Sequence, residues 1–204
     1  MATRIGEIIE SSTLSYTAGT YTLLAAPAFG ALVLADTTDP QVQIYGVVTD
    51  VRTTSREPGG RAIVRGQSYA GRELYNEQIY QAHPDLKEVL QTEFSVYVLG
   101  YRRGTTVVQR IPPQASPVHY SVVSADVDAI RGFAEDLGYV RMLITAAHLP
   151  ADELIVALVR TCMEVHPDGA HAYAVRVGRA LTTVLRDDVD RARQILTRIR
   201  SAVA

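Results

Sequence analysis

The stretch Ile111-Pro-Pro-Gln-Ala-Ser-Pro117 divides the chain into two parts with different residue patterns. Its prolines exclude a helix or an inner strand, because proline lacks the backbone N–H that both structures need and restricts the residue before it. We therefore expect an extended linker here. The pattern is typical of strands before the linker and of helices after it. This change predicts one domain over residues 1–120 and a second over residues 121–204.

Before the linker, short β-branched and aromatic runs alternate with clusters of Gly, Pro, Asp and Ser. Several short strands at close spacing favour a small closed barrel, because closure leaves no unpaired edge. A helical interruption is predicted over Glu73–Gln81, and a shorter one over Leu86–Gln91 after Pro84. The predicted strands are Ile5–Ser11, Thr20–Leu24, Ala31–Ala35, Gln43–Val51, Ala62–Arg65, Phe94–Tyr101 and Thr106–Ile111.

After the linker, apolar residues recur at helical spacing. A first helix is predicted to begin at an N-cap, Ser124, and to end at Leu137-Gly138, with Met142–Ala147 continuing the pattern. Further helices are predicted over Asp152–Val165 after Pro150, over Asp168–Leu185, and over about Asp187–Val203. The apolar face of the last helix consists of Val189, Ala192, Ile195, Leu196, Ile199 and Val203. The predicted fold class is α+β, a small closed barrel followed by a helical bundle.

Composition sets limits on function. The net charge of −2 gives no overall field that would draw the chain to DNA or an acidic membrane. No apolar run reaches the roughly 18 residues that a membrane span needs, and the start of the chain does not resemble a signal peptide, so a cytoplasmic location is expected. The only lysine, Lys87, follows Leu86. A P-loop needs a lysine after glycine, so the chain is not expected to hydrolyse nucleotides by itself.

No catalytic, cofactor-binding or metal-binding residues are predicted, and the chain is not expected to be an enzyme. The strongest metal candidate is His166, Asp168 and His171, whose side chains are of the types that bind zinc or iron. Their spacing fits no established ligand pattern, so we favour a polar turn in which Asp168 caps the following helix. Cys162 lies among apolar residues and is predicted to be buried and inert.

A local cluster of arginines is the clearest candidate contact site. Five of them, with Glu57 as the one acid, surround a predicted hairpin tip at Pro58-Gly59-Gly60, with Tyr69 nearby. An exposed loop of this kind can reach phosphates or a carboxylate-lined protein surface, whereas a solvated loop is the alternative. The predicted contact residues are Arg52, Arg56, Arg61, Arg65 and Arg72.

Four stretches of the first part resemble a known family, the HAS barrel. They are Arg4-Ile-Gly-Glu-Ile-Ile9, Gly30-Ala-Leu-Val-Leu-Ala35, Ile44-Tyr-Gly-Val-Val-Thr-Asp-Val51 and Thr92-Glu-Phe-Ser-Val-Tyr-Val-Leu-Gly-Tyr101. The proline-rich exit that ends at Val118-His119 is also similar. The family is named for HerA-type DNA translocases and ATP synthase subunits. In the translocases the barrel precedes a P-loop ATPase core, and here a helical segment follows instead.

The resemblance implies a free-standing barrel that organises assembly beside a motor encoded elsewhere. The leading hypothesis is a non-enzymatic adaptor for a ring-forming HerA-type ATPase in DNA processing, with DNA reached through that partner. Self-association or docking through the barrel flank or the final helix is also expected. Two alternatives stay open: direct nucleic-acid binding by the Arg52–Arg72 loop, and a metal-dependent enzyme at His166, Asp168 and His171.

Overall fold

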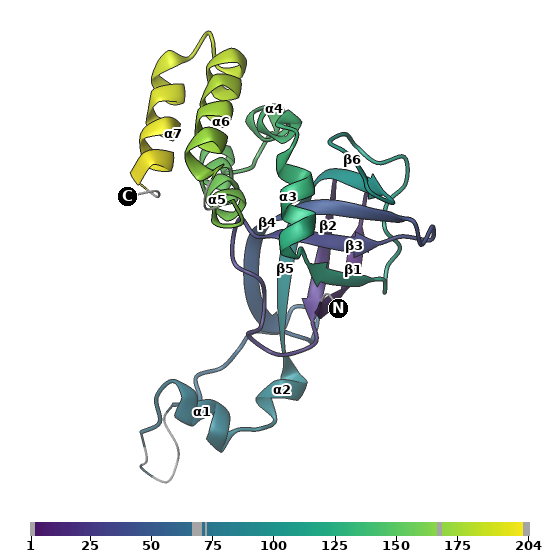
Figure 1. Cartoon of the computed structure of the whole chain (residues 1–204). Coiled ribbons are helices and arrows are strands. Elements are labelled where there is room, and N and C mark those ends of the chain that lie inside the picture. Colours follow the sequence, from purple (N-terminus) through teal and green to yellow (C-terminus); the bar gives the residue numbers. More distant parts are fainter. Residues whose placement is uncertain (1–2, 67–70, 72, 167–168, 202–204) are drawn as a thin grey trace.

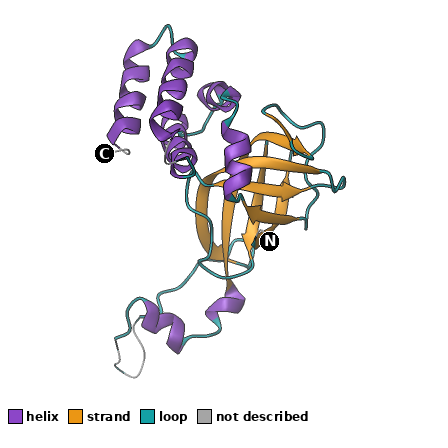
Figure 2. Ribbon diagram, viewed as in Figure 1, coloured by secondary structure: helices purple, strands orange, loops and turns teal. Residues whose placement is uncertain are grey.

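The computed structural model describes residues 3–66, 71, 73–166 and 169–201. It has a barrel with helices packed on one side and an arm that extends from one end (Figures 1 and 2). This arrangement confirms the α+β class and the order of barrel before helices. The barrel strands are β1 (Arg4–Ser11), β2 (Ser15–Thr20), β3 (Leu32–Asp36), β4 (Val42–Ser55), β5 (Leu90–Arg103) and β7 (Ser121–Ser124).

The six strands form a closed ring of antiparallel pairs in the order β2-β1-β7-β3-β4-β5, and β5 pairs with β2 to complete it. A further strand, β6 (Thr106–Val108), pairs with β5 outside the ring. Because side chains alternate across each strand, one set fills the barrel and the other faces outward. The interior is filled by Ile8, Tyr16, Ala18, Val33, Ala35, Ile44, Val48, Phe94, Val96, Val98 and Val122.

The proline-rich stretch does not end the barrel. After it, His119 N–H donates to the Ile8 carbonyl at 2.8 Å, and β7 then pairs with β1 and β3. The expectation that Thr106–Ile111 is the last strand of the barrel is therefore wrong, because the closing strand comes after the linker and before the helices. The division into domains over residues 1–120 and 121–204 stays a prediction, although β7 places four barrel residues in the second range.

Two predicted strands are also wrong. The chain turns at residues 21–24, where a strand was expected over Thr20–Leu24, and the strand in this region is β2, which ends at Thr20. Residues 62–65 form no strand, although they are β-branched enough to predict one. Both errors have one cause: strand pairing depends on partners far away in the chain, and local composition does not report them.

The helices after β7 are α3 (Val127–Ala134), α4 (Gly138–Thr145), α5 (Ala151–Glu164), α6 (Ala170–Val184) and α7 (Val189–Ser201). Asp126, rather than Ser124, caps α3, and its carboxylate accepts the Ala129 N–H at 2.9 Å. Gly138 begins α4 rather than ending a helix. Asp168 and Val203, which were expected inside the last two helices, lie outside the described residues.

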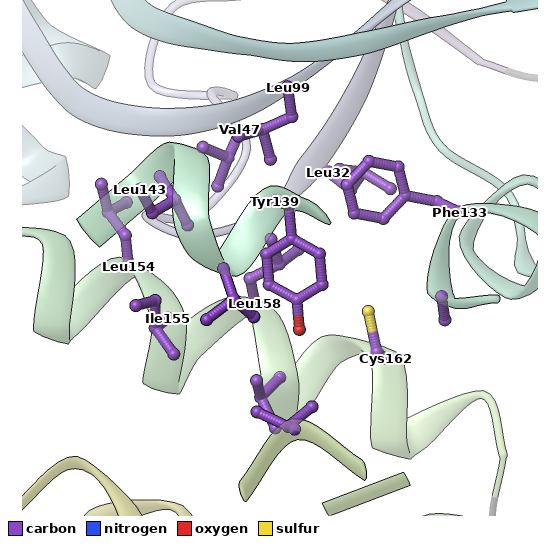
Figure 3. Close-up of a cluster of buried hydrophobic side chains, with 14 of the residues drawn as sticks. Leu32, Val47, Leu99, Phe133, Tyr139, Leu143, Leu154, Ile155, Leu158 and Cys162 are labelled. Atoms are coloured by element: carbon purple, nitrogen blue, oxygen red, sulfur yellow. The ribbon is translucent and has the colours of Figure 1, made fainter. Parts of the chain in front are cut away.

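A second core joins the helices to the outer face of the barrel. Outward-facing side chains of β3, β4 and β5, among them Leu32, Val47 and Leu99, pack against α3, α4 and α5 (Figure 3). Tyr45 extends from β4 beneath α3, where its hydroxyl donates to the Ala129 carbonyl at 3.0 Å. Its ring lies 5.2 Å from the ring of Phe133. The helices therefore cover the barrel from outside, without filling its interior.

Gln109 connects this helical layer to the end of β6. Its amide N–H groups donate to the carbonyls of Phe133, at 2.8 Å, and Asp136, at 3.1 Å. Its side-chain oxygen accepts the Tyr139 N–H at 2.7 Å. One buried amide therefore satisfies carbonyls at the end of α3 and an N–H group at the start of α4, groups that a helix cannot satisfy within itself.

Candidate partner-contact surface

The predicted arginine contact site lies where β4 leaves the barrel and the chain enters an arm over residues 56–89. The arm contains α1 (Glu77–Ala82) and α2 (Leu86–Val89), and it returns to the barrel as β5. Figure 1 shows it extending away from the barrel and from the α5–α7 layer. Because the arm extends away from the rest of the molecule, another molecule can reach it.

The arginines do not gather into one cationic tip. Arg52 is on β4 and forms an ion pair at 2.7 Å with Glu93, its cross-strand neighbour on β5. Arg56 donates from Nε to the Leu90 carbonyl at 3.1 Å, which fixes the base of the arm. Arg65 reaches Asp85 at 2.9 Å. These three guanidinium groups are used within the chain.

The other two predicted contacts differ in status. Arg61 is exposed in the extended part of the arm and makes no ion pair within the described part of the chain. Arg72 lies outside the described residues, as does Tyr69. The role of the five arginines in partner contact stays a prediction. Of the described four, Arg52 and Arg65 are in ion pairs, whereas Arg56 and Arg61 have no acidic partner among the described residues.

Charge across the whole arm is balanced. Residues 56–89 contain five arginine and lysine side chains and five carboxylates. The arginines lie mostly in the first half of the arm and the carboxylates in the second, and the fold brings Asp85 back to Arg65. Binding to a phosphate backbone depends on an excess of positive charge, and the balanced composition of this arm does not supply one.

Exposed apolar side chains are the feature that sequence analysis missed. Leu86 is the only buried side chain among the described residues of the arm, and α1 has none. Ile63 is 72% exposed and Val64 88% exposed. They border a groove of about 600 Å³ that Leu74, Tyr75, Ile79, Tyr80, Leu86 and Leu90 also line. The sequence did contain a sign of this exposure: Ile63 and Val64 lie in a short strand-like run for which no partner strand could be named.

A segment this exposed cannot be stabilised by its own burial. Isolated apolar residues on a surface are ordinary, but contiguous ones mark contact sites. Here extended residues and a short helix present Ile63, Val64 and Tyr75 together around one groove. The chemistry of the arm is therefore that of a protein contact, with Arg61 as a charged neighbour.

The histidine candidate does not form a metal site in the described residues. His166 follows the end of α5, and its ring nitrogen Nδ1 lies 2.9 Å from the Cys162 carbonyl of that helix, while the ring stacks on Tyr173. His171 is exposed on α6, and Asp168 lies outside the described residues. Within those described ranges, no group of three or more His, Cys, Asp or Glu side chains could hold a metal ion.

The closed ring of six strands identifies the first part of the chain as a small β-barrel. Residues 5–104 match the model of the HAS barrel domain family. The first half of this chain is a HAS barrel domain. The match runs from β1 to the turn after β5, so it includes the arm. The closing strand β7 and all the helices that follow lie beyond it.

Other comparisons add little to this assignment. No curated protein was found to match the chain. Among the described helices, none combines the length and apolar character needed to cross a bilayer. Residues 5–104 are thus assigned to the HAS barrel domain family.

Proposed function

We propose that this protein is a non-enzymatic assembly module that binds a ring-forming, HerA-type P-loop ATPase involved in DNA processing, with the arm as the contact. The observation that carries the proposal is the arm itself: its described residues bury only Leu86 and expose Ile63, Val64 and Tyr75. Membership of a family that includes the barrels of such ATPases supports the choice of partner.

Binding to a partner would cover the exposed apolar side chains of the arm. Moving an exposed Ile or Val side chain into an interface contributes about 1.5–3 kcal/mol, and about 1.4 kcal/mol changes a dissociation constant tenfold. Ile63 and Val64 can therefore act as the anchors of a contact, with Arg61 steering a carboxylate-bearing surface toward them.

The experiment is co-expression of this chain with the HerA-type ATPase encoded in the same genome. Complex formation is followed by light scattering after size exclusion, and affinity by biolayer interferometry. The double variant Ile63→Asp/Val64→Asp is expected to lose at least about tenfold in affinity, since its carboxylates would be buried without partners.

The matched control is Ile111→Asp/Val118→Asp, which changes another exposed isoleucine and valine outside the arm. It is expected to bind like the parent. Arg61→Ala tests the predicted arginine contact separately, and a weaker association with an intact fold is expected, because Arg61 is exposed and makes no ion pair within the described part of the chain. An ATPase that does not bind, or binds equally well to the Ile63→Asp/Val64→Asp variant, contradicts the proposal.

Direct nucleic-acid binding by the Arg52–Arg72 loop is the second candidate. The ion pairs of Arg52 and Arg65 and the balanced charge of the arm weigh against it. A salt-dependent affinity of the purified chain for DNA, lost in Arg61→Ala, would favour it over the ATPase proposal.

A further inference from the structure

The helix pair α6 and α7 lies far from the arm (Figure 1). A second groove is found on this pair. It has a volume of about 720 Å³ and lies between α6 and α7. Only these two helices and the turn between them supply its lining, which consists of His171, Ala174, Val175, Gly178, Thr182, Leu185, Val189, Ala192, Arg193, Leu196, Ile199 and Arg200.

The groove follows from how α7 uses its apolar residues. Ile195 and Ile199 are buried in the core that the helices share with the barrel. Val189 belongs to the same predicted apolar face but is 60% exposed, and Val175 of α6 is 41% exposed. The apolar face of α7 is therefore wider than the surface that the chain covers.

Small residues on α6 keep the groove deep. A Cβ at Gly178 would lie 3.3 Å from the Leu196 side chain, so α7 approaches α6 closely at this point. Ala174, one turn earlier on the same face, also leaves space that a larger side chain would fill. The result is an apolar channel along a helix pair, with valines at its edges.

The charge around the groove is positive. Its lining includes Arg193 and Arg200, and among the described residues that line it there is no carboxylate. Residues 170–201 contain seven arginines and three aspartates, although the whole chain has a net charge of −2. The hairpin of α6 and α7 is thus a local cationic region.

Two other arginines of α7 are already paired on the opposite side. Arg191 contacts Asp152 of α5 at 2.8 Å, and Arg198 contacts Glu153. Within the described ranges, the one ion pair of Arg193 is with Asp190 of its own helix, at 3.3 Å, and this solvent-exposed pair contributes little to stability. Arg193 can therefore exchange this contact for a carboxylate of a partner.

We propose that this groove binds an amphipathic helix of another protein, one that carries acidic residues along the edge of its apolar face. Apolar side chains at i, i+3 or i+4, and i+7 would enter the channel between Val175 and Val189, as in other helix-in-groove contacts. Carboxylates beside that stripe would face Arg193 and Arg200. This surface is separate from the arm and does not depend on the ATPase proposal.

Charge argues against two other occupants. A second copy related by a twofold axis would bring two surfaces of the same positive charge together, so Arg193 and Arg200 would find no carboxylate among the lining residues of the other groove. A nucleic acid would place phosphates over a channel whose floor is apolar, so most of that floor would stay uncovered. An acidic amphipathic helix would cover the apolar residues of the groove and would also place carboxylates beside Arg193 and Arg200.

The test uses the full chain and a displayed library of helical peptides. The library fixes leucine at i, i+3, i+4 and i+7 and varies the flanking positions between Glu and Lys. Selection is expected to enrich Glu at the flanks. A synthetic peptide of the enriched sequence is then measured by fluorescence anisotropy, and its affinity is expected to fall as NaCl rises from about 0.05 M to about 0.5 M.

Variants locate the binding site. Arg193→Glu/Arg200→Glu is expected to lower the affinity at least about tenfold. Arg179→Glu/Arg186→Glu changes the charge of the same hairpin equally at residues that do not line the groove, and should bind like the parent. Val175→Asp should also abolish binding, while Val127→Asp, an exposed valine on α3, should not. Circular dichroism verifies that each variant is folded.

Several outcomes overturn the proposal. These are enrichment of Lys or of no charge at the flanks, equal peptide affinity in Arg193→Glu/Arg200→Glu and in the parent, or DNA that competes with the peptide. A dimer that dissociates when Val175 is replaced would assign the groove to a second copy of this chain instead.

Discussion

Gly30 lies directly against Ala157 of α5: a Cβ added to Gly30 would lie 2.3 Å from the Cβ of Ala157. Gly30 also has a φ of +79°, which side-chain-bearing residues rarely adopt. Its N–H donates to the Val48 carbonyl at 2.8 Å, so the local backbone is held in place. The contact between α5 and the turn that precedes β3 therefore requires glycine.

Gly30→Ala is expected to lower the free energy of unfolding by at least about 2 kcal/mol, from the steric contact and the backbone strain together. Urea denaturation measures it. Gly59→Ala is the matched control, since Gly59 has a φ of +74° and a Cβ there would meet no atom within 4 Å. A control that costs as much as Gly30→Ala would show that strain alone, and no contact with Ala157, sets the requirement.

Gln109→Leu is expected to lower the free energy of unfolding by about 1–3 kcal/mol, because it leaves the Tyr139 N–H and the Phe133 carbonyl buried without partners. Denaturant unfolding of the variant measures the loss. Gln114→Leu, at an exposed position in the linker, should be close to neutral. If the two variants were equally stable, ordered water would have to replace the amide.

Two apolar residues of α7 that both border the α6–α7 groove should respond differently to the same substitution, because they differ in burial. Ile199 is 2% exposed, so Ile199→Asp buries an unpaired carboxylate and is expected to unfold the helical layer at a cost of several kcal/mol. Val189 is 60% exposed and should tolerate Val189→Asp with little change in melting temperature. Thermal unfolding followed by circular dichroism tests both. A folded Ile199→Asp variant would mean that Ile199 belongs to an intermolecular interface.

Alkaline pH is expected to destabilise the protein. Burial raises the pKa of the Cys162 thiol to about 11, against about 8.5 in an unfolded chain. Above about pH 8.5 the unfolded state loses this proton and the folded state keeps it, so the free energy of unfolding falls as pH rises through this range. Burial also raises the pKa values of Tyr139 and Tyr173, which steepens the fall above about pH 10.

Thermal unfolding between about pH 7.5 and pH 10.5 measures this dependence. Cys162→Ala should flatten the part of the curve below about pH 10. The native thiol should also resist alkylation at about pH 8 until denaturant is added, because the thiolate is the reactive form. Rapid labelling of the folded chain would show that Cys162 is not enclosed as described.

Purified protein is expected neither to bind nor to hydrolyse ATP. Without a lysine after a glycine-rich loop, no P-loop can hold the β- and γ-phosphates. Phosphate release and equilibrium dialysis with labelled ATP measure the two properties. Turnover that persists after rigorous removal of contaminating ATPases would contradict this prediction.

Local patterns predicted the helices better than the strands. The apolar spacing located α5 and α7 to within a few residues, since helical hydrogen bonds are local and the buried face repeats along the segment. β7 has only four residues, and its partners lie in β1 and β3, about 90 to 120 residues earlier in the chain. No local signal distinguishes Val122-Val123 from the end of a linker.

The contacts of the predicted arginines could not be foreseen from the sequence for a similar reason. The arginines cluster in sequence, which predicted a cationic loop. Their partners, Glu93 and Asp85, come from segments 41 and 20 positions away and are brought to them by the β4–β5 pair and by the returning arm. The sequence pattern placed Ile63 and Val64 in a strand, where they would be covered by neighbours. The structure has no strand there, and both side chains are exposed.

The position of β7 also determines how force would pass through the molecule. This strand is hydrogen-bonded on both sides, to β1 and to β3, and only Ala125 and Asp126 separate it from α3. Tension applied to the helices therefore passes directly to a strand that keeps the barrel closed, and no slack linker absorbs it. Under load, the helical layer cannot be drawn away without shearing β7 from its neighbours, so detachment of the helices and opening of the barrel are one mechanical event.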